Sequence, residues 1–168
     1  MKASPLVLLM MGSDTDLPVM QEAADILDLF SIPYEMRISS AHRSPVRTLA
    51  LASESAGRGV KIIIAGAGMA AHLAGVVASK TILPVIGVPM PGGALNGVDA
   101  LYATVQMPGG IPVATMAIGK AGAKNAGLFA VQILALTEPL LAESLVRYRV
   151  EMDRELEQKD ADLQTRIG

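Results

Sequence analysis

The stretch from Ile38 to Pro45 reads Ile-Ser-Ser-Ala-His-Arg-Ser-Pro and carries the side chains of this protein best suited to chemistry. It joins an apolar, strand-like run, residues 34–39, to a helix expected from about Ser44. Ligands of open α/β sheets bind outside the carboxyl ends of the strands, so such a joint is where a site is expected. An imidazole moves protons near neutral pH, and a guanidinium binds phosphate through paired hydrogen bonds. A helix N-cap beside an incidental solvent-exposed histidine explains His42 about equally well at this point.

Two further joints of the same kind carry polar or glycine-rich sequence. Residues 12–16 read Gly-Ser-Asp-Thr-Asp, and residues 66–72 read Gly-Ala-Gly-Met-Ala-Ala-His and end in the only other histidine, His72. Glycines let a backbone approach a ligand closely, while hydroxyls, Arg43 and helix N-terminal N–H groups favour an anion. The three joints together predict a phosphate and sugar site at one sheet edge. For His72, a structural role is at least as good an explanation as a catalytic one.

Other kinds of site are disfavoured. The glycine-rich joint has Ala71 at the third position of a dinucleotide fingerprint, and no acidic residue ends the second strand, where ribose recognition requires one. The chain has no cysteine, which excludes thiolate metal sites and thiol nucleophiles. Two histidines alone make a poor metal site. We therefore expect no bound metal.

Composition limits the partners and the location. A net charge of -2 provides no basic field for nucleic acid or an anionic membrane, and two Phe, three Tyr and no Trp provide little base stacking. Hydrophobic residues make up 51% and the mean hydropathy is +0.43, yet glycines and His72 interrupt the longest apolar stretch, residues 62–79. A membrane span needs about 20 predominantly apolar residues. Without a signal-peptide pattern or cysteine, the sequence favours a cytoplasmic protein.

Strands and helices are predicted to alternate along the chain. Apolar strands are expected at residues 6–11, 34–39, 60–65, 83–88 and 113–118, and helices at 17–30, 45–57, 70–80, 98–106 and 119–136. This alternation is typical of βαβ units that form a parallel sheet with helices on both faces. At 168 residues, the chain 1–168 is expected to form a single catalytic domain. Residues 89–97 form the longest irregular stretch, and long loops are usually functional or disordered.

The composition becomes more charged from Glu138 onward. An amphipathic helix is expected to about Gln164, with one face formed by Leu141, Leu145, Tyr148 and Met152. The preceding helices are rich in alanine and glycine and apolar nearly all round, which favours burial on more than one side. In a small protein, such surfaces point to subunit interfaces. We expect a homo-oligomer in which residues 138–168 pack on a neighbouring subunit.

Four motifs together resemble the bacterial class I PurE family, the N5-carboxyaminoimidazole ribonucleotide mutases of de novo purine (IMP) biosynthesis. They are residues 11–16, 40–45, 66–73 and 105–113, and the resemblance extends to about residue 136. It implies a flavodoxin-like, three-layer αβα sandwich with a parallel sheet of about five strands, a long C-terminal helix and a homo-octamer. It also implies an isomerase that moves a carboxylate from the exocyclic N5 of the ribonucleotide to ring carbon C4, with no metal or organic cofactor.

The same resemblance assigns roles to individual residues. His42 matches the catalytic acid and base. Substrate-binding positions are matched by Ser13, Asp16, Ser40 and Arg43, and the segment lining the base and carbon dioxide pocket by Gly68, His72 and Leu73. The family usually has Gly where this chain has Met69 and Pro where it has Ala74, and both residues flank that pocket.

Two other functions remain open from the sequence. The first is an aminoimidazole ribonucleotide carboxylase that uses free carbon dioxide, a class that lacks the Ala-Ala-His-Leu pattern of residues 70–73. The second is a nucleotide-binding regulatory module without catalysis. Turnover of the ribonucleotide would separate an enzyme from such a module.

Overall fold

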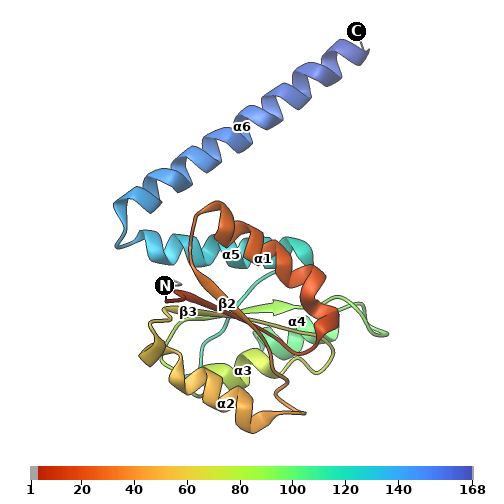
Figure 1. Cartoon of the computed structure of the whole chain (residues 1–168). Coiled ribbons are helices and arrows are strands. Elements are labelled where there is room, and N and C mark those ends of the chain that lie inside the picture. The colour runs from red at the N-terminus through yellow and green to blue at the C-terminus, as the bar shows by residue number, and fades with distance from the viewer. Residues whose placement is uncertain (1–3, 168) are drawn as a thin grey trace. The chain divides into compact units, whose positions relative to one another are not determined.

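The computed structural model describes residues 4–167, and the chain divides into two compact units between Ala130 and Val131. The first unit contains a five-stranded sheet in the order β2-β1-β3-β4-β5, in which every neighbouring pair is parallel. This is the flavodoxin-like strand order. Helices flank the sheet (Figure 1), so the predicted αβα architecture with a five-stranded parallel sheet is confirmed.

The elements alternate as the sequence predicts. The strands are β1 (Val7–Met11), β2 (Tyr34–Ile38), β3 (Ile62–Ala67), β4 (Val85–Pro89) and β5 (Ala114–Thr115). The helices are α1 (Leu17–Leu29), α2 (Pro45–Glu54), α3 (Leu73–Ala78), α4 (Val98–Val105), α5 (Lys120–Ala135) and α6 (Pro139–Ile167). Short 3-10 helices, Asp14–Asp16 and Ala56–Arg58, precede α1 and follow α2. Helices α2 and α3 lie on one face of the sheet, and α1 lies on the other (Figure 1).

The central strands are buried on both faces. Every residue of β1 and of β4 is buried, as expected for apolar runs in a parallel sheet covered on two sides. On one face, Leu8 and Ile63 pack in a cluster with Val77 of α3. On the other, Gly127 of α5 lies so close to α1 that a Cβ there would be 2.9 Å from the Ala23 carbonyl oxygen. The sheet is therefore a rigid platform for the loops at its ends.

The segment between β3 and α3 differs from the prediction. The strand extends to Ala67 because Gly66 and Ala67 pair with β4. The helix starts only at Leu73. Before it, the N–H of Ala71 donates to the Met69 carbonyl at 2.8 Å and that of His72 donates to the Ala70 carbonyl at 2.7 Å. These tight turns place His72 just before the helix and not within its first turn.

The fifth strand is shorter than the predicted residues 113–118. Only Ala114 and Thr115 form ladder pairs with β4. The chain nevertheless continues alongside β4, because the N–H of Met116 donates to the Gly87 carbonyl and that of Gly119 to the Pro89 carbonyl, both at 2.9 Å. Beyond the two-residue strand β5, single hydrogen bonds therefore hold the chain against β4.

The second unit contains the end of α5 and the long helix α6, which confirms the predicted C-terminal helix. None of the α6 residues from Pro139 to Ile167 is buried. Its exposed large apolar residues are Leu140, Val146, Val150, Met152, Leu156, Leu163 and Ile167. Across residues 4–167, each helix is too short or too polar to cross a membrane.

Candidate active site

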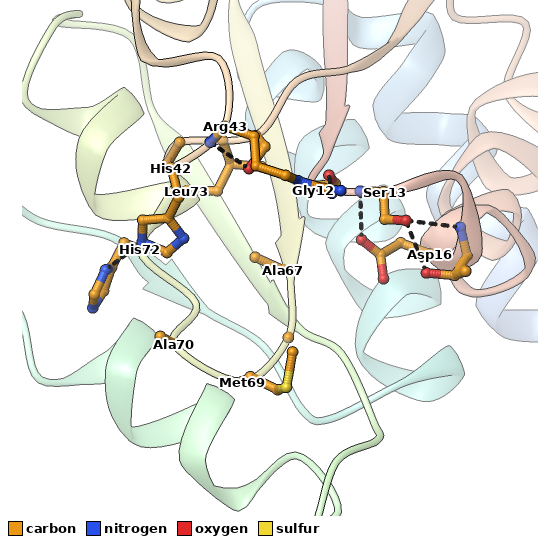
Figure 2. Close-up of a pocket in the computed structure, with 14 residues that line it drawn as sticks. Gly12, Ser13, Asp16, His42, Arg43, Ala67, Met69, Ala70, His72 and Leu73 are labelled. Carbon is orange, nitrogen blue, oxygen red and sulfur yellow. Dashed lines mark hydrogen bonds between the residues drawn. The ribbon is translucent and has the colours of Figure 1, made fainter.

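The strand register brings the three polar joints together at one edge of the sheet. Met11, the last residue of β1, pairs with Ile38 at the end of β2 and with Gly66 near the end of β3. Strand order reverses between β1 and β3, and ligands of doubly wound sheets bind at such a switch point. A cleft of about 440 Å³ opens there, and its walls come from the loops after β1, β2 and β3 (Figure 2).

Every site residue predicted from the sequence lines this cleft. They are Ser13, Asp16, Ser40, His42, Arg43, Gly68, His72 and Leu73. The remaining lining is Gly12, Thr15, Ala41, Ala67, Met69 and Ala70. Figure 2 shows His42 and His72 toward one end of the cleft and Ser13 with Asp16 toward the other. The cleft is thus elongated, with imidazoles at one end and a hydroxyl and a carboxylate at the other.

The joint after β1 is fixed by a reciprocal cap. The Ser13 N–H donates to Asp16 Oδ2 at 3.0 Å, and the Ser13 hydroxyl oxygen accepts the Thr15 N–H at 3.3 Å. Such a capping box satisfies two backbone donors that would otherwise lack partners. The sequence Gly-Ser-Asp-Thr-Asp therefore folds locally into a short helical turn. That turn holds the Asp16 carboxylate at the wall of the cleft.

Burial raises the pKa of the Asp16 carboxyl above its ordinary value. Hydrogen bonds from backbone N–H groups, including that of Ser13, and the charge of Arg43 oppose this effect, while the charge of Asp14 adds to it. A carboxylate that has lost part of its hydration gains from new hydrogen-bond donors. Asp16 is therefore suited to accept hydrogen bonds from the hydroxyl groups of a ligand.

Arg43 lies across the end of β1. Its Nη2 donates to the Gly12 carbonyl oxygen at 2.9 Å, and its backbone N–H donates to the Ser40 hydroxyl at 3.2 Å. The first bond fixes the guanidinium, which has five N–H donors in all, and leaves most of them for a ligand. The second bond leaves the hydroxyl hydrogen of Ser40 able to donate. Both side chains can therefore donate to an anion bound beside them.

A buried hydrogen bond that the sequence did not reveal supports this joint. Ser39 Oγ and Thr48 Oγ1 are 2.8 Å apart, and both residues are buried. Next to them, the Ser44 hydroxyl accepts the Ser40 N–H and donates to the Ser40 carbonyl, each at 3.1 Å. These bonds tie the end of β2 to the first turns of α2. The only hint in the sequence is a threonine, Thr48, on the same buried face of α2 as Ala52.

The two histidines, 30 residues apart, meet in the cleft. His42 Nε2 lies 2.8 Å from His72 Nδ1, and the rings are edge to face with centroids 4.9 Å apart and planes at 82°. One nitrogen donates to the other, and the tautomers decide which. If His42 carries protons on both nitrogens, its Nε2–H donates to His72. Its Nδ1–H then remains for a bound molecule.

The glycines after β3 allow close packing beneath the cleft. A Cβ on Gly66 would overlap the side chains of Met90 and Met20, and one on Gly68 would lie 3.3 Å from Met90 Cβ. Between these glycines and His72, Met69 adopts a φ of 51°, a left-handed conformation that glycine adopts most easily. Its side chain lies against the loop of residues 89–97, because a Cβ on Gly93 would be 3.3 Å from Met69 Cγ.

Within residues 4–167, no three histidine, cysteine or carboxylate side chains gather closely enough to hold a metal ion. The polar groups of the cleft are hydroxyls, a carboxylate, a guanidinium and two imidazoles. This set suits a phosphorylated sugar. The paired imidazoles beside it suit proton transfer.

The chain is similar to known proteins along most of its length. The family model described as AIR carboxylase matches residues 6–155. A relative from Pyrococcus horikoshii, named N5-carboxyaminoimidazole ribonucleotide mutase, is 56% identical over 155 residues, which cover 92% of this chain and 86% of that protein. A relative from Schizosaccharomyces pombe, named phosphoribosylaminoimidazole carboxylase, is 50% identical over 165 residues, 98% of this chain but 29% of that protein. A crystal structure of PurE from Treponema denticola has a TM-score of 0.85 and 31% identity, and the match covers 95% of this chain and 98% of that one.

Proposed function

Because the chain belongs to the AIR carboxylase family, we infer that it converts N5-carboxyaminoimidazole ribonucleotide to 4-carboxy-5-aminoimidazole ribonucleotide in purine biosynthesis. It is an isomerase that transfers a carboxylate within one molecule. Relatives that the chain matches along most of their length are named as the mutase. The carboxylase name belongs to a protein of which the chain matches only 29%, so the mutase activity is favoured.

Within the site, the contact between the two histidines at one end of an elongated cleft best supports the mutase activity. The aminoimidazole ring lies at that end, where His42 reaches both its N5 and its C4. The ribose hydroxyls donate to Asp16. Ser13, Ser40 and Arg43 bind the phosphate, which the guanidinium suits through paired hydrogen bonds.

The reaction requires that one proton is added to N5 and that one proton is removed from C4. His42 protonates N5 as the carbamate C–N bond breaks, which releases carbon dioxide and leaves a free amine. The electron-rich C4 then attacks the carbon dioxide and forms the new C–C bond. His42 takes the proton from C4, restores the aromatic ring and returns to its starting state. One imidazole can perform both transfers because a histidine side chain can act as a general acid and, once it has given up its proton, as a general base.

His72 supports this cycle through its contact with His42. When His42 is protonated, its Nε2–H donates to His72 Nδ1 across the 2.8 Å contact. Hydrogen bonds with one ionised partner are stronger than neutral ones. His72 therefore stabilises the imidazolium of His42 and directs the other nitrogen of that ring to the substrate. His72 is a positioning residue in this scheme, in addition to lining the base pocket with Gly68 and Leu73.

Carbon dioxide must stay in the cleft between the two steps. The lining next to His72 is apolar and consists of Ala67, Met69, Ala70 and Leu73. Such an apolar wall holds no ordered water, so it keeps away the water that would otherwise react with carbon dioxide. The Met69 side chain extends this wall to the loop at Gly93. Retention of carbon dioxide in this way distinguishes a mutase from an enzyme that draws on free carbon dioxide.

We also propose that the protein acts as a homo-octamer in the cytoplasm. Residues 1–168 serve as one catalytic domain, and residues 138–168 pack on a neighbouring subunit. The exposed apolar residues of α6 support this packing, because a monomer gains nothing from exposing them to water. The absence of cysteine and the small ribonucleotide substrate support a cytoplasmic location.

The test is to mix the protein with the N5-carbamate substrate in bicarbonate-free buffer and follow the ultraviolet absorbance of the product. Conversion that does not need bicarbonate establishes the mutase. Conversion that requires added bicarbonate, starting from aminoimidazole ribonucleotide, establishes the carboxylase. Binding without any conversion leaves a regulatory module.

A further inference from the structure

The cleft continues beyond Arg43. A second hollow of about 460 Å³ shares Gly12, Ser13, Ser40 and Arg43 with the cleft described above. Its other lining residues are Asp14, Ile38, Ser39, Ser44 and Arg47. Because the two hollows share part of their lining, a long ligand can occupy both. A ribonucleotide, with its base, sugar and phosphate in a row, is such a ligand.

Arg47 stands out among the residues that only the second hollow contains. It lies in the first turn of α2, four positions after Arg43, and its side chain is exposed. Among the described residues, no carboxylate lies within ion-pair distance of Arg47, whereas Arg37, Arg58, Arg147 and Arg154 all form ion pairs. A guanidinium that forms no ion pair with the described residues, on the wall of a hollow, is available to an anionic ligand.

The charges of the second hollow favour an anion. Two guanidinium groups, Arg43 and Arg47, line it together with one carboxylate, Asp14. The Asp14 carboxylate already accepts the Ser13 hydroxyl at 3.0 Å and the Thr15 N–H at 3.1 Å. Its charge is therefore partly balanced by local donors. Arg43, with one bond to the Gly12 carbonyl, and Arg47 leave a surplus of N–H donors in this hollow.

We propose that the 5′-phosphate of the ribonucleotide enters this second hollow and that Arg47 binds it together with Arg43. This inference rests on the proposed function, which places the base at His42 and His72. With the base at that end, the phosphate extends past Asp16 and Arg43. A phosphate monoester carries about −1.5 to −2 charges at neutral pH. One guanidinium leaves much of this charge unbalanced, whereas two match it.

Arg47→Gln removes the positive charge and keeps a polar side chain. We expect the KM for the ribonucleotide to rise about 10-fold, which corresponds to 1.4 kcal/mol and is near the lower end for a hydrogen bond to a charged group. We expect kcat to change less than about 2-fold, because Arg47 binds the phosphate equally in ground and transition states. The matched control is Lys61→Gln, which removes one exposed charge just before β3, at the opposite edge of the sheet. This control should behave as wild type.

A binding experiment separates this inference from the proposed function. Calorimetry with 5-aminoimidazole ribonucleotide and with its dephosphorylated riboside needs no turnover. Arg47→Gln should weaken binding of the ribonucleotide about 10-fold and leave binding of the riboside unchanged. Equal weakening of both ligands, or no weakening of either, overturns the role of Arg47. If wild type binds the ribonucleotide through Arg47 but converts no substrate, the proposed function fails while the phosphate site stands.

Discussion

Replacing His42 with asparagine removes the imidazole that the proposed mechanism uses for both proton transfers. The side chain is exposed, and its hydrogen bond is the 2.8 Å contact with His72. Loss of one such bond at an exposed site changes the free energy of unfolding by about 1 kcal/mol at most. The variant is therefore expected to fold and assemble as wild type, so that its kinetics report on chemistry.

The expected loss is in turnover. General acid–base catalysis contributes about 100- to 10,000-fold, so His42→Asn should lower kcat by at least about 100-fold. Substrate affinity should stay within about 3-fold, because a group that acts in the transition state contributes little to ground-state binding. Asparagine keeps the polarity of the near half of the ring but cannot shuttle a proton.

His72→Asn measures the contact between the two rings. A hydrogen bond to a charged group stabilises it by about 1.5–3 kcal/mol, so this variant should lower kcat by about 10- to 150-fold. If His72 acts only through His42, the double variant should be little slower than His42→Asn alone. This non-additivity is the signature of two residues that work as a unit.

Single-turnover rates and calorimetric binding of the ribonucleotide on both single variants and the double variant decide the matter. Near-normal turnover by His42→Asn would refute the acid–base role. A collapse of ribonucleotide binding in that variant would make His42 a binding residue. Full additivity of the two losses would show that His72 acts independently of His42.

Three further changes test other parts of the proposal. Arg43→Ala should weaken ribonucleotide binding by about 1.5–3 kcal/mol and riboside binding little, as measured by calorimetry; equal losses would make Arg43 a structural residue. Asp16→Asn tests a pKa that burial raises. The folded state holds the Asp16 proton more tightly than the unfolded chain does. The contribution of Asp16 to the free energy of unfolding is therefore present at acid pH and is lost as the pH rises through the pKa of Asp16 in the folded state. Asp16→Asn should therefore raise Tm at neutral pH more than at acid pH while it weakens substrate binding, and a lower Tm at neutral pH would contradict this. Deletion from Pro139 onward should break up the oligomer in sedimentation experiments; an unchanged high-mass species would argue against interface helices, and a wild-type monomer would refute the assembly.

Much of the fold follows from short apolar runs in the sequence. The run that became β1 has no polar residue, and burial on both faces of a parallel sheet is the physical reason. The alternation of strands and helices predicts the layers, because parallel neighbours need a crossover helix. The strand order does not follow from periodicity, since β1 pairs with both β2 and β3 through contacts between distant segments. The family resemblance implied a flavodoxin-like sheet, and the observed strand order agrees with it.

The end of β3 shows where the strand propensity of single residues fails to predict the boundary of a strand. Glycine is disfavoured in strands, so the sequence predicted that β3 ends before Gly66. In the sheet, Gly66 pairs with Val88, and the absence of a side chain lets Met20 and Met90 fill the space beside it. Tertiary packing thus overrides the propensity of a single residue. No pattern in one sequence reports which side chains will meet there.

The site was predicted as three joints at one sheet edge, and the structure brings those joints together. That His42 and His72 could meet at one sheet edge follows from the joints in which they lie. Their direct contact could not be predicted, because it depends on the register of β1, β2 and β3 and on the tight turns before α3. The role of Arg47 was also missed. Nothing in its local sequence distinguishes it from a solvent-exposed arginine on a helix. Only the second hollow next to Arg43 does so.

Met69, which stands where the family usually has glycine, lies in the segment that positions His72 against His42. The resemblance expects glycine there, and a left-handed conformation costs a residue with a Cβ roughly 1–2 kcal/mol. The chain nevertheless keeps a φ of 51° at Met69, because Gly66 and Gly68 pack closely against Met90 and fix the backbone on its N-terminal side. The turn bonds that follow set His72 ahead of α3, where its Nδ1 reaches His42. The backbone geometry that the histidine pair needs is therefore held by packing beneath the cleft, and the methionine side chain is free to extend its apolar wall.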